Sequence, residues 1–337
     1  MGQYWLGSDA FWKAKEEWVL PIQELVRDFE SDDFEMILTS SGTTGVPKEF
    51  RFSKKQVIAS AYRTLKTFGL RKGMKAMLPI SSHYVGGKMM IIRSILGEID
   101  LLLLEPSRSP LKNVEGFFDF APMVPLQVLN SSEEDLTRLK KVIIGGASVS
   151  SLLQEKIRKI ESVDFFEVFG MSETLSNFSF RDLRNEKSFF SLQDGVEIRV
   201  DERSCLMVSV EGVTDGFLST NDVVDLKNGG FEWKGRFDFV VNSGGVKLFP
   251  EQLEAALNDF LNQGDKVVFY GVQSSDYGQE LVGFYYGDLE SSISEMESRL
   301  VSLFGKYAKP RFWRRILDLK FTSSGKFDRV STIESII

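Results

Sequence analysis

Short apolar runs alternate with helix-period segments along the first two thirds of the chain. The runs have strand length, and the segments between them repeat apolar residues about every 3.6 positions. The expected strands cover 34–38, 75–79, 99–104, 142–145 and 165–169, and the expected helices cover 53–68, 85–96 and 150–160. Because strands separated by helices of this length form βαβ units, this region predicts an α/β fold with a largely parallel sheet.

The pattern changes twice in the last third of the chain. From Gly195 to Trp233 it shows short strands and turns, which predict a small β-rich subdomain. After Asp238 the expected elements are a helix opening at Pro250, strands at 266–272, 281–286 and 316–321, and a helix at 293–304. The first of these helices would bury Leu253, Ala256, Leu257 and Phe260. We therefore predict two domains, 1–237 and 238–337, of which the second is a small α+β domain.

Composition narrows the class of protein. The 337 residues are 42% hydrophobic and include 28 phenylalanines, which is enough for sizeable cores and excludes a disordered chain. The net charge of −7 argues against nucleic-acid binding and against an anionic membrane as partner. A single cysteine, Cys205, excludes an internal disulfide and a cysteine-based metal cluster, and a single histidine, His83, excludes a histidine-rich metal site.

The two most hydrophobic candidates for targeting or membrane insertion do not fit those roles. Residues 1–20 mix Trp, Lys and Glu, unlike a secretory signal, and charged residues interrupt 89–104. A cytoplasmic protein without membrane insertion is therefore expected. Its oligomeric state is left open by the sequence.

The segment 39–48 carries the strongest chemical signal. It contains five hydroxyl side chains, two glycines and one lysine, directly after the expected strand 34–38. Glycines let backbone N–H groups approach an anion, while hydroxyls and the lysine add donors and positive charge. This combination suits a polyphosphate, although a chance turn rich in Ser and Gly is the alternative. Neither a Walker A order nor a dinucleotide-binding glycine motif is present.

This segment resembles the phosphate loop of the adenylate-forming ligases, the acyl-CoA synthetase (AMP-binding) superfamily, with the pattern [ST]-S-G-[ST]-T-G-x-P-K. Five further stretches resemble motifs of that superfamily in the same order: 145–147, 169–173, 218–222, 235–254 and 322–329. Each alone has a structural alternative, such as a strand end or a solvated turn. Together they imply a large N-terminal α/β adenylation domain and a small mobile C-terminal domain.

The resemblance also implies an ATP site. Its expected residues are Thr39, Ser40, Ser41, Gly42, Thr43, Thr44, Gly45 and Lys48 on the phosphates, Gly145, Gly146, Ala147, Phe169 and Gly170 at adenine, and Asp222 and Arg236 at ribose or phosphate. Ser172 would meet the α-phosphate and Glu173 would hold Mg²⁺. One departure occurs before Asp222, where Asn221 replaces the glycine of the superfamily.

The same resemblance implies a two-step reaction. ATP and a small carboxylic acid would form an acyl-adenylate, and coenzyme A would then displace AMP. Lys326, with Ser172 and Glu173, would be catalytic in the first step, and Asp238 would be the hinge. The Gly244–Gly245 turn would line the pantetheine tunnel in the second step.

The branch of o-succinylbenzoate–CoA ligases in menaquinone synthesis gives a more specific resemblance. Only 38 residues precede Thr39, a short N-terminal portion of the kind found in that branch, and 78–90, 102–107 and 119–128 also fit it. The expected acyl-site residues are His83, Gly86, Gly87, Lys88 and Arg93. The glycines would make room for an aromatic ring, and Lys88 or Arg93 would pair with the succinyl carboxylate. A structural role for each cation is the alternative.

Other functions stay open. Another aryl or acyl acid could be the substrate, and a carrier protein could replace coenzyme A as the acceptor. A non-catalytic nucleotide-binding relative is a further alternative, although it would predict the loss of Lys326 or Glu173, and both are present.

Overall fold

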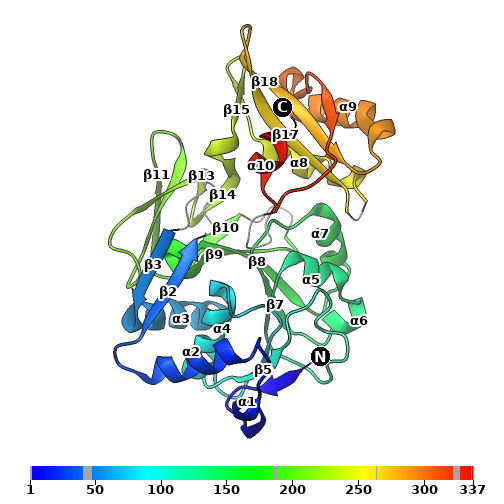
Figure 1. The fold of residues 1–337 in the computed structure, drawn as a ribbon. Helices are drawn as coiled ribbons and strands as arrows, with labels where there is room; N and C mark the ends of the chain where they lie inside the picture. The colour runs from blue at the N-terminus through cyan, green and yellow to red at the C-terminus, as the bar shows by residue number, and fades with distance from the viewer. Residues whose placement is uncertain are drawn as a thin grey trace.

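The computed structural model describes residues 2–40, 48–185, 189–262, 264–321, 327–334 and 336 (Figure 1). A large lower part contains the N-terminus, and a smaller upper part contains the C-terminus (Figure 1). None of the helices within these ranges combines the length and apolar character needed to cross a bilayer.

The largest sheet has nine strands and forms the centre of the first part. In spatial order they are β11 (Val196–Val200), β12 (Cys205–Val210), β13 (Leu218–Lys227), β14 (Gly230–Arg236), β10 (Phe190–Leu192), β9 (Ser176–Asp182), β8 (Asp164–Met171), β7 (Lys141–Ile144) and β6 (Ala121–Met123). Only β6, β7 and β8 run parallel. The remaining neighbours are antiparallel, because short connections join β11 to β14 in succession. The prediction of a largely parallel sheet was therefore wrong for this sheet, and the β-rich region continues it.

Two smaller sheets complete the first part. One contains β1 (Gln3–Trp5), β5 (Asp100–Leu104) and β4 (Lys75–Leu78), with β4 parallel to β5. The other is the hairpin of β2 (Glu35–Ser40) and β3 (Lys48–Ser53). The helices are α1 (Asp9–Lys13), α2 (Leu20–Glu30), α3 (Lys54–Phe68), α4 (Val85–Leu96), α5 (Pro125–Asn130), α6 (Glu133–Leu136) and α7 (Ser151–Arg158).

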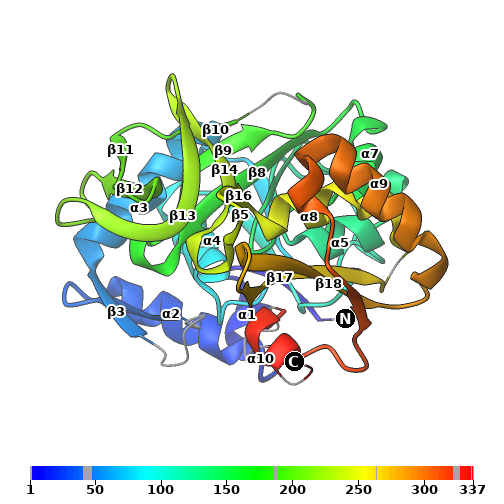
Figure 2. The same ribbon diagram turned by 90° about the horizontal axis from the view of Figure 1, so that it is seen from above.

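Local sequence signals explain where the expected helices begin and end. Ser53 caps α3 by accepting from the backbone N–H of Gln56, whose side chain accepts from the N–H of Ser53. Gly69 ends the same helix in a left-handed conformation at φ 66°. Helices α2, α3 and α4 lie side by side (Figure 2), and an apolar core forms between them and β4 and β5.

The second part has its own five-stranded sheet and core. Its strands are β16 (Val246–Leu248), β15 (Val241–Ser243), β18 (Gly278–Tyr286), β17 (Lys266–Ser274) and, parallel to β18, β19 (Trp313–Arg315). Its helices are α8 (Pro250–Ala256), α9 (Ile293–Phe304) and α10 (Arg329–Glu334). The expected strand at 316–321 was wrong: β19 ends before it, and no neighbouring strand covers Leu317, which is 86% exposed.

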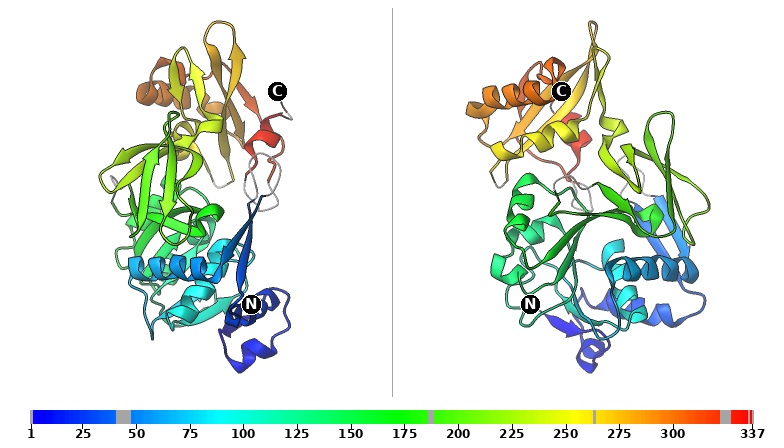
Figure 3. Two further views of the ribbon diagram at one scale, coloured as in Figure 1. Left: turned by 90° about the vertical axis from the view of Figure 1, so that its left-hand side faces the viewer. Right: turned by 180° about the vertical axis from the view of Figure 1, so that it is seen from behind.

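Single 3₁₀ turns occur at η1 (Ser172–Thr174), η2 (Phe237–Phe239), η3 (Asn258–Phe260), η4 (Glu290–Ser292) and η5 (Lys306–Ala308). Among these, η2 carries the chain from β14 to β15, and so from the nine-stranded sheet to the five-stranded sheet. Figure 3 shows the second part seated on one end of the first. A domain boundary at Asp238 remains our prediction.

Candidate functional site

The hairpin of β2 and β3 positions both ends of the predicted phosphate loop. Ser40 pairs with Lys48 and Thr39 pairs with Glu49, so the two strands stay in register up to the loop. The predicted residues Ser41, Gly42, Thr43, Thr44 and Gly45 lie outside the described residues. Strand β2 lies beside η1, which brings the base of the loop next to the predicted magnesium ligand.

The turn η1 places Ser172 and Glu173 between two closely spaced strands. A Cβ atom on Gly170 would lie 2.2 Å from the carbonyl oxygen of Ser176, so only glycine permits this approach of β8 and β9. The turn ends at Leu175 in a left-handed conformation, at φ 54°. Ser172 and Glu173 are half-buried there, at the carboxyl end of β8.

The predicted adenine residues lie at the same edge of the sheet. Gly145, Gly146 and Ala147 directly follow β7, which is parallel to β8, so both strands end on one side. Gly146 has φ 87° and is exposed, as is Ala147. Phe169 is partly exposed. Its ring packs against three core phenylalanines, with centroid distances of 5.4–5.7 Å: Phe178, Phe190 and Phe231.

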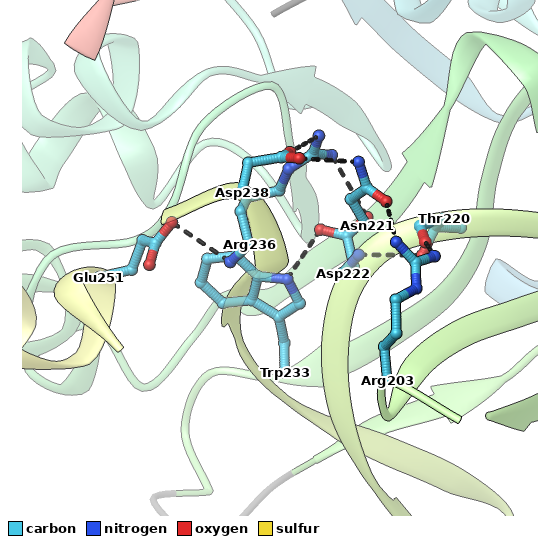
Figure 4. A network of polar contacts seen from close by, with 8 residues as sticks. All are labelled: Arg203, Thr220, Asn221, Asp222, Trp233, Arg236, Asp238 and Glu251. Carbon is cyan, nitrogen blue, oxygen red and sulfur yellow. Dashed lines mark hydrogen bonds and ion pairs between the residues drawn. The ribbon is translucent and has the colours of Figure 1, made fainter. Parts of the chain in front are cut away.

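Asp222 is the most constrained carboxylate of the predicted ATP site (Figure 4). It is 7% exposed, and its Oδ1 accepts a hydrogen bond of 2.9 Å from Trp233 Nε1. Arg236 Nη1 lies 3.7 Å from its Oδ2. Burial raises the pKa of Asp222, Trp233 and Arg236 oppose that shift, and the charges of Asp238 and Glu173 add to it. Glu173 and Asp222 therefore share one electrostatic environment.

A second set of contacts connects this carboxylate to the predicted hinge. Arg236 Nη2 donates to Asp238 Oδ2 at 2.8 Å, and Asn221 Nδ2 donates to Asp238 Oδ1 at 2.9 Å. Arg203 Nη1 donates to Asn221 Oδ1 at 3.2 Å. The result is a continuous polar network from Arg203 to Asp222 (Figure 4).

Sequence reasoning missed Trp233 and Arg203 in this network. Trp233 lies on β14, opposite β13, and the turn between those strands would have been a usable signal for pairing it with Asp222. Arg203 lies in the turn between β11 and β12, and no motif marks it.

The structure does not bring the predicted coenzyme A residues to this network. Gly244 and Gly245 form the tip of the β15–β16 hairpin, at φ 56° and 80°. Gly244 N donates to Tyr277 O at 3.1 Å, and a Cβ atom on Gly244 would lie 2.7 Å from the ring of Tyr307. Gly244 therefore packs within the second part, whereas a Cβ atom on Gly245 would meet no atom within 4 Å.

Lys326, the predicted catalytic lysine, lies outside the described residues. The helix that follows it, α10, is firmly anchored. Arg329 Nη2 donates to Glu254 Oε2 at 2.8 Å, and its Nη1 donates to the carbonyl of Phe269 at 2.8 Å. Its guanidinium also lies 4.9 Å from the ring centroid of Phe239, in η2. Helix α10 is thus fixed next to the predicted hinge.

Helix α4 carries four of the five predicted acyl-site residues, and His83 lies just before it. Gly86 and Lys88 are half-buried and His83 is exposed. A Cβ atom on Gly87 would lie 2.3 Å from the carbonyl oxygen of Ser81. This glycine therefore permits close packing of the backbone, and its role in making room for an aromatic ring stays a prediction. Lys88 Nζ donates to Ile37 O at 3.3 Å, and burial lowers its pKa.

Arg93 is a buried cation without a counter-charge in the described part of the chain. It is 1% exposed, and its Nη2 donates to Ser176 Oγ at 2.9 Å and to Asn177 Oδ1 at 3.2 Å. Its Nε has no hydrogen-bond partner, and no carboxylate in the described part of the chain forms an ion pair with it. Burial lowers the pKa of Arg93 to about 9. Such a charge is expensive to bury, and a ligand anion would offset that cost.

The described side chains supply too few ligands for a magnesium site of their own, so a bound phosphate would have to supply others. Within the described ranges, no group of three or more His, Cys, Asp or Glu side chains gathers to hold a metal ion. Magnesium commonly uses one or two protein carboxylates and takes its other ligands from phosphates and water. Glu173 is the residue predicted to supply the protein carboxylate of such a site.

Comparisons with known proteins give the same family as the sequence motifs. The family model described as AMP-binding enzyme matches residues 5–204. The 2-succinylbenzoate–CoA ligase of Staphylococcus epidermidis is 22% identical over 333 residues, covering 89% of this chain and 70% of that protein. A corresponding ligase from Staphylococcus aureus is also 22% identical, covering 92% of this chain and 68% of that protein.

Solved structures show the same fold. An acyl-CoA synthetase (AMP-forming)/AMP-acid ligase II-like protein from Dyadobacter fermentans is 28% identical, with a TM-score of 0.65 and 100% coverage of both chains. The o-succinylbenzoate CoA synthetase of Bacillus subtilis, in complex with its acyl-adenylate intermediate, is 17% identical with a TM-score of 0.77, covering 87% of this chain and 68% of that one. The same synthetase has also been solved with ATP and a magnesium ion.

Proposed function

This chain belongs to the AMP-binding enzyme family, and we propose that it joins o-succinylbenzoate to coenzyme A through an acyl-adenylate, in menaquinone biosynthesis. The observation that carries the substrate is Arg93, a buried cation without a carboxylate partner in the described residues, on a helix expected to line the acyl site. o-Succinylbenzoate has two carboxylates, so one can react while the other pairs with a cation. The names of the curated relatives support the same substrate. A cytoplasmic location remains a prediction.

On the nucleotide side, we assign binding to the network around Asp222. Among the described residues its Oδ2 has only the ion pair at 3.7 Å to Arg236, which leaves this oxygen able to accept hydrogen bonds from ribose hydroxyls. Arg236 would contact ribose or phosphate, and Thr39 to Lys48 would enclose the β- and γ-phosphates. Glu173 would hold Mg²⁺, which supplies charge neutralisation for the phosphates.

On the reacting side, we assign roles to Ser172, Lys326 and the tip formed by Gly244 and Gly245. Ser172 would donate to the α-phosphate, and Lys326 would neutralise charge that develops on the carboxylate and α-phosphate oxygens during adenylation. The Gly244–Gly245 tip would meet the pantetheine only after the second part has turned about Asp238.

The function is tested by acid-dependent release of pyrophosphate with ATP and Mg²⁺. The panel contains o-succinylbenzoate, benzoate, cinnamate and fatty acids, with the coenzyme A thioester identified by mass. Benzoate is the matched control, because it keeps the aromatic ring and a carboxylate but lacks the succinyl carboxylate. We expect turnover of o-succinylbenzoate and little turnover of benzoate.

Three other results would change the proposal. Equal turnover of benzoate would remove Arg93 from substrate recognition. Selective turnover of another acid would keep the adenylation mechanism and discard o-succinylbenzoate. Measurable ATP binding without release of pyrophosphate for any acid would favour a non-catalytic nucleotide-binding protein.

A further inference from the structure

Asn221 occupies the centre of the network that joins the nine-stranded sheet to the hinge (Figure 4). Its amide group uses both of its ends: Nδ2 donates to Asp238 Oδ1 at 2.9 Å, and Oδ1 accepts from Arg203 Nη1 at 3.2 Å. An amide offers a donor and an acceptor on adjacent atoms, whereas a glycine at this position could make neither contact. The replacement of glycine by Asn221 therefore adds a connection to the hinge.

We propose that Asn221 is a positioning residue that holds Asp238, and with it the second part of the molecule, in the arrangement seen here. This proposal rests on the proposed function for its consequence, a bias toward the arrangement that precedes thioester formation. It does not rest on the identity of the acid. Arg203 supports Asn221, and it is itself held by Asp201 at 2.9 Å and stacked over the ring of Phe237 at 4.9 Å.

The location of this contact explains why it would matter. Asn221 belongs to β13 of the nine-stranded sheet, while Asp238 lies in η2, the turn that leads into the second sheet. A backbone rotation at Asp238 would change the direction of its side chain relative to β13, and so would break the bond to Asn221. The hydrogen bond would exist in the arrangement seen here and be absent after the rotation, so it would favour the first of these two arrangements.

A cavity of about 290 Å³ lies beside η2, and residues of both parts line it, including Arg203, Val223, Asn242 and Lys247. The two parts also touch next to it, where α8 contacts β14 and Arg236 N donates to Glu251 Oε1 at 3.3 Å. The bond between Asn221 and Asp238 is one of several contacts across the hinge and contributes a part of the bias, as expected of one hydrogen bond.

The test measures the arrangement directly by energy transfer between two fluorophores. They would be attached to cysteines introduced at exposed Glu161 and Ser302, one on each part, while the native Cys205 is buried. Asn221→Gly should lower the ratio of this arrangement to the alternatives by about fivefold, which corresponds to the loss of one hydrogen bond. Ser219→Gly is the matched control, because it adds a glycine to the same strand at an exposed position and should leave the ratio unchanged.

A double-mutant cycle separates positioning from a general effect on folding. In an Asp238→Ala background, Asn221→Gly should have no further effect on the energy transfer, because its partner is already absent. An equal shift in both backgrounds, or no shift in either, would overturn the proposal. In single-turnover assays, Asn221→Gly should speed thioester formation from supplied acyl-adenylate several-fold, and slower or unchanged formation would also count against it. Energy transfer requires no acid, so a failure to activate any acid would reject the proposed function without deciding the role of Asn221.

Discussion

The buried charged residues of the predicted nucleotide side and of the predicted acyl side have different kinds of partner. On the nucleotide side, the buried carboxylate of Asp222 has a hydrogen bond from Trp233 and an ion pair with Arg236. On the acyl side, Arg93 is more deeply buried and has only uncharged partners among the described residues. The buried carboxylate thus has a charged partner in Arg236, whereas Arg93 has none among the described residues.

This difference distinguishes ATP binding, which related enzymes share, from the choice of acid, in which they can differ. Every relative that uses ATP needs the same ribose and phosphate contacts, and these can be built into the protein with internal partners. A buried cation without a counter-ion instead favours substrates that bring an anion with them. We therefore expect variants on the two sides to fail in different ways, and the predictions below test that difference.

The largest expected effect comes from Lys326→Ala. Adenylation should slow by roughly 10²–10³-fold, because one charge contact that stabilises the transition state is lost. The rate of pyrophosphate release in a single turnover measures this step. Thioester formation from supplied acyl-adenylate should be preserved, because this lysine is not expected to act in the second step. Equal losses in both half-reactions would contradict the assignment.

An intermediate effect is expected from Arg93→Met, which keeps most of the side-chain volume and removes the charge. The KM for o-succinylbenzoate should rise roughly 10- to 100-fold, the range for losing a hydrogen bond to a charged group, while the KM for ATP should stay the same. The free energy of unfolding should not fall, because an uncompensated buried charge is removed along with the contacts.

Lys88→Met is the matched control for that variant, since it removes another cation from the same helix. Lys88 keeps a backbone carbonyl as partner and is only half-buried. If Lys88→Met raises the KM for the acid and Arg93→Met does not, the recognition of the second carboxylate belongs to Lys88. A loss of ATP affinity in Arg93→Met would contradict the separation of the two sides.

The sequence was informative where a local signal decides the structure. A capping box and a C-terminal glycine define α3, and helical spacing gave α9 as Ile293–Phe304. The family motifs predicted the enzyme class, an AMP-forming acid–CoA ligase, which is confirmed by the match to the AMP-binding enzyme family and by the ligases that resemble this chain. They also gave Asp222, Arg236 and Asp238, which the structure places in one network.

Contacts between distant segments were harder to predict. The role of Gly87 depends on a backbone carbonyl at Ser81, and the strand at 313–315 is set by pairing with β18, not by its own apolar pattern. Arg203 joins the hinge network through a turn that carries no motif. Each of these features depends on tertiary packing, which overrides local preference and cannot be read from residue spacing.

The smallest expected effect comes from Asp222→Asn on the nucleotide side. The KM for ATP should rise roughly tenfold, because the amide accepts weaker hydrogen bonds from the ribose than the carboxylate does, and the KM for the acid should stay the same. The free energy of unfolding, in contrast, should be higher in the variant than in the native protein. Burial raises the pKa of Asp222 above its unfolded value, so ionisation disfavours the folded state as the pH rises from the unfolded pKa to the raised one. Denaturant unfolding from about pH 3 to about pH 8 should therefore show the variant gaining on the native protein with increasing pH, from near equality below the unfolded pKa of about 3.9. If the native protein instead gains on the variant with increasing pH, the ion pair with Arg236 outweighs the burial of Asp222, and the contrast with the unpaired charge of Arg93 would be sharper than the pKa of Asp222 indicates.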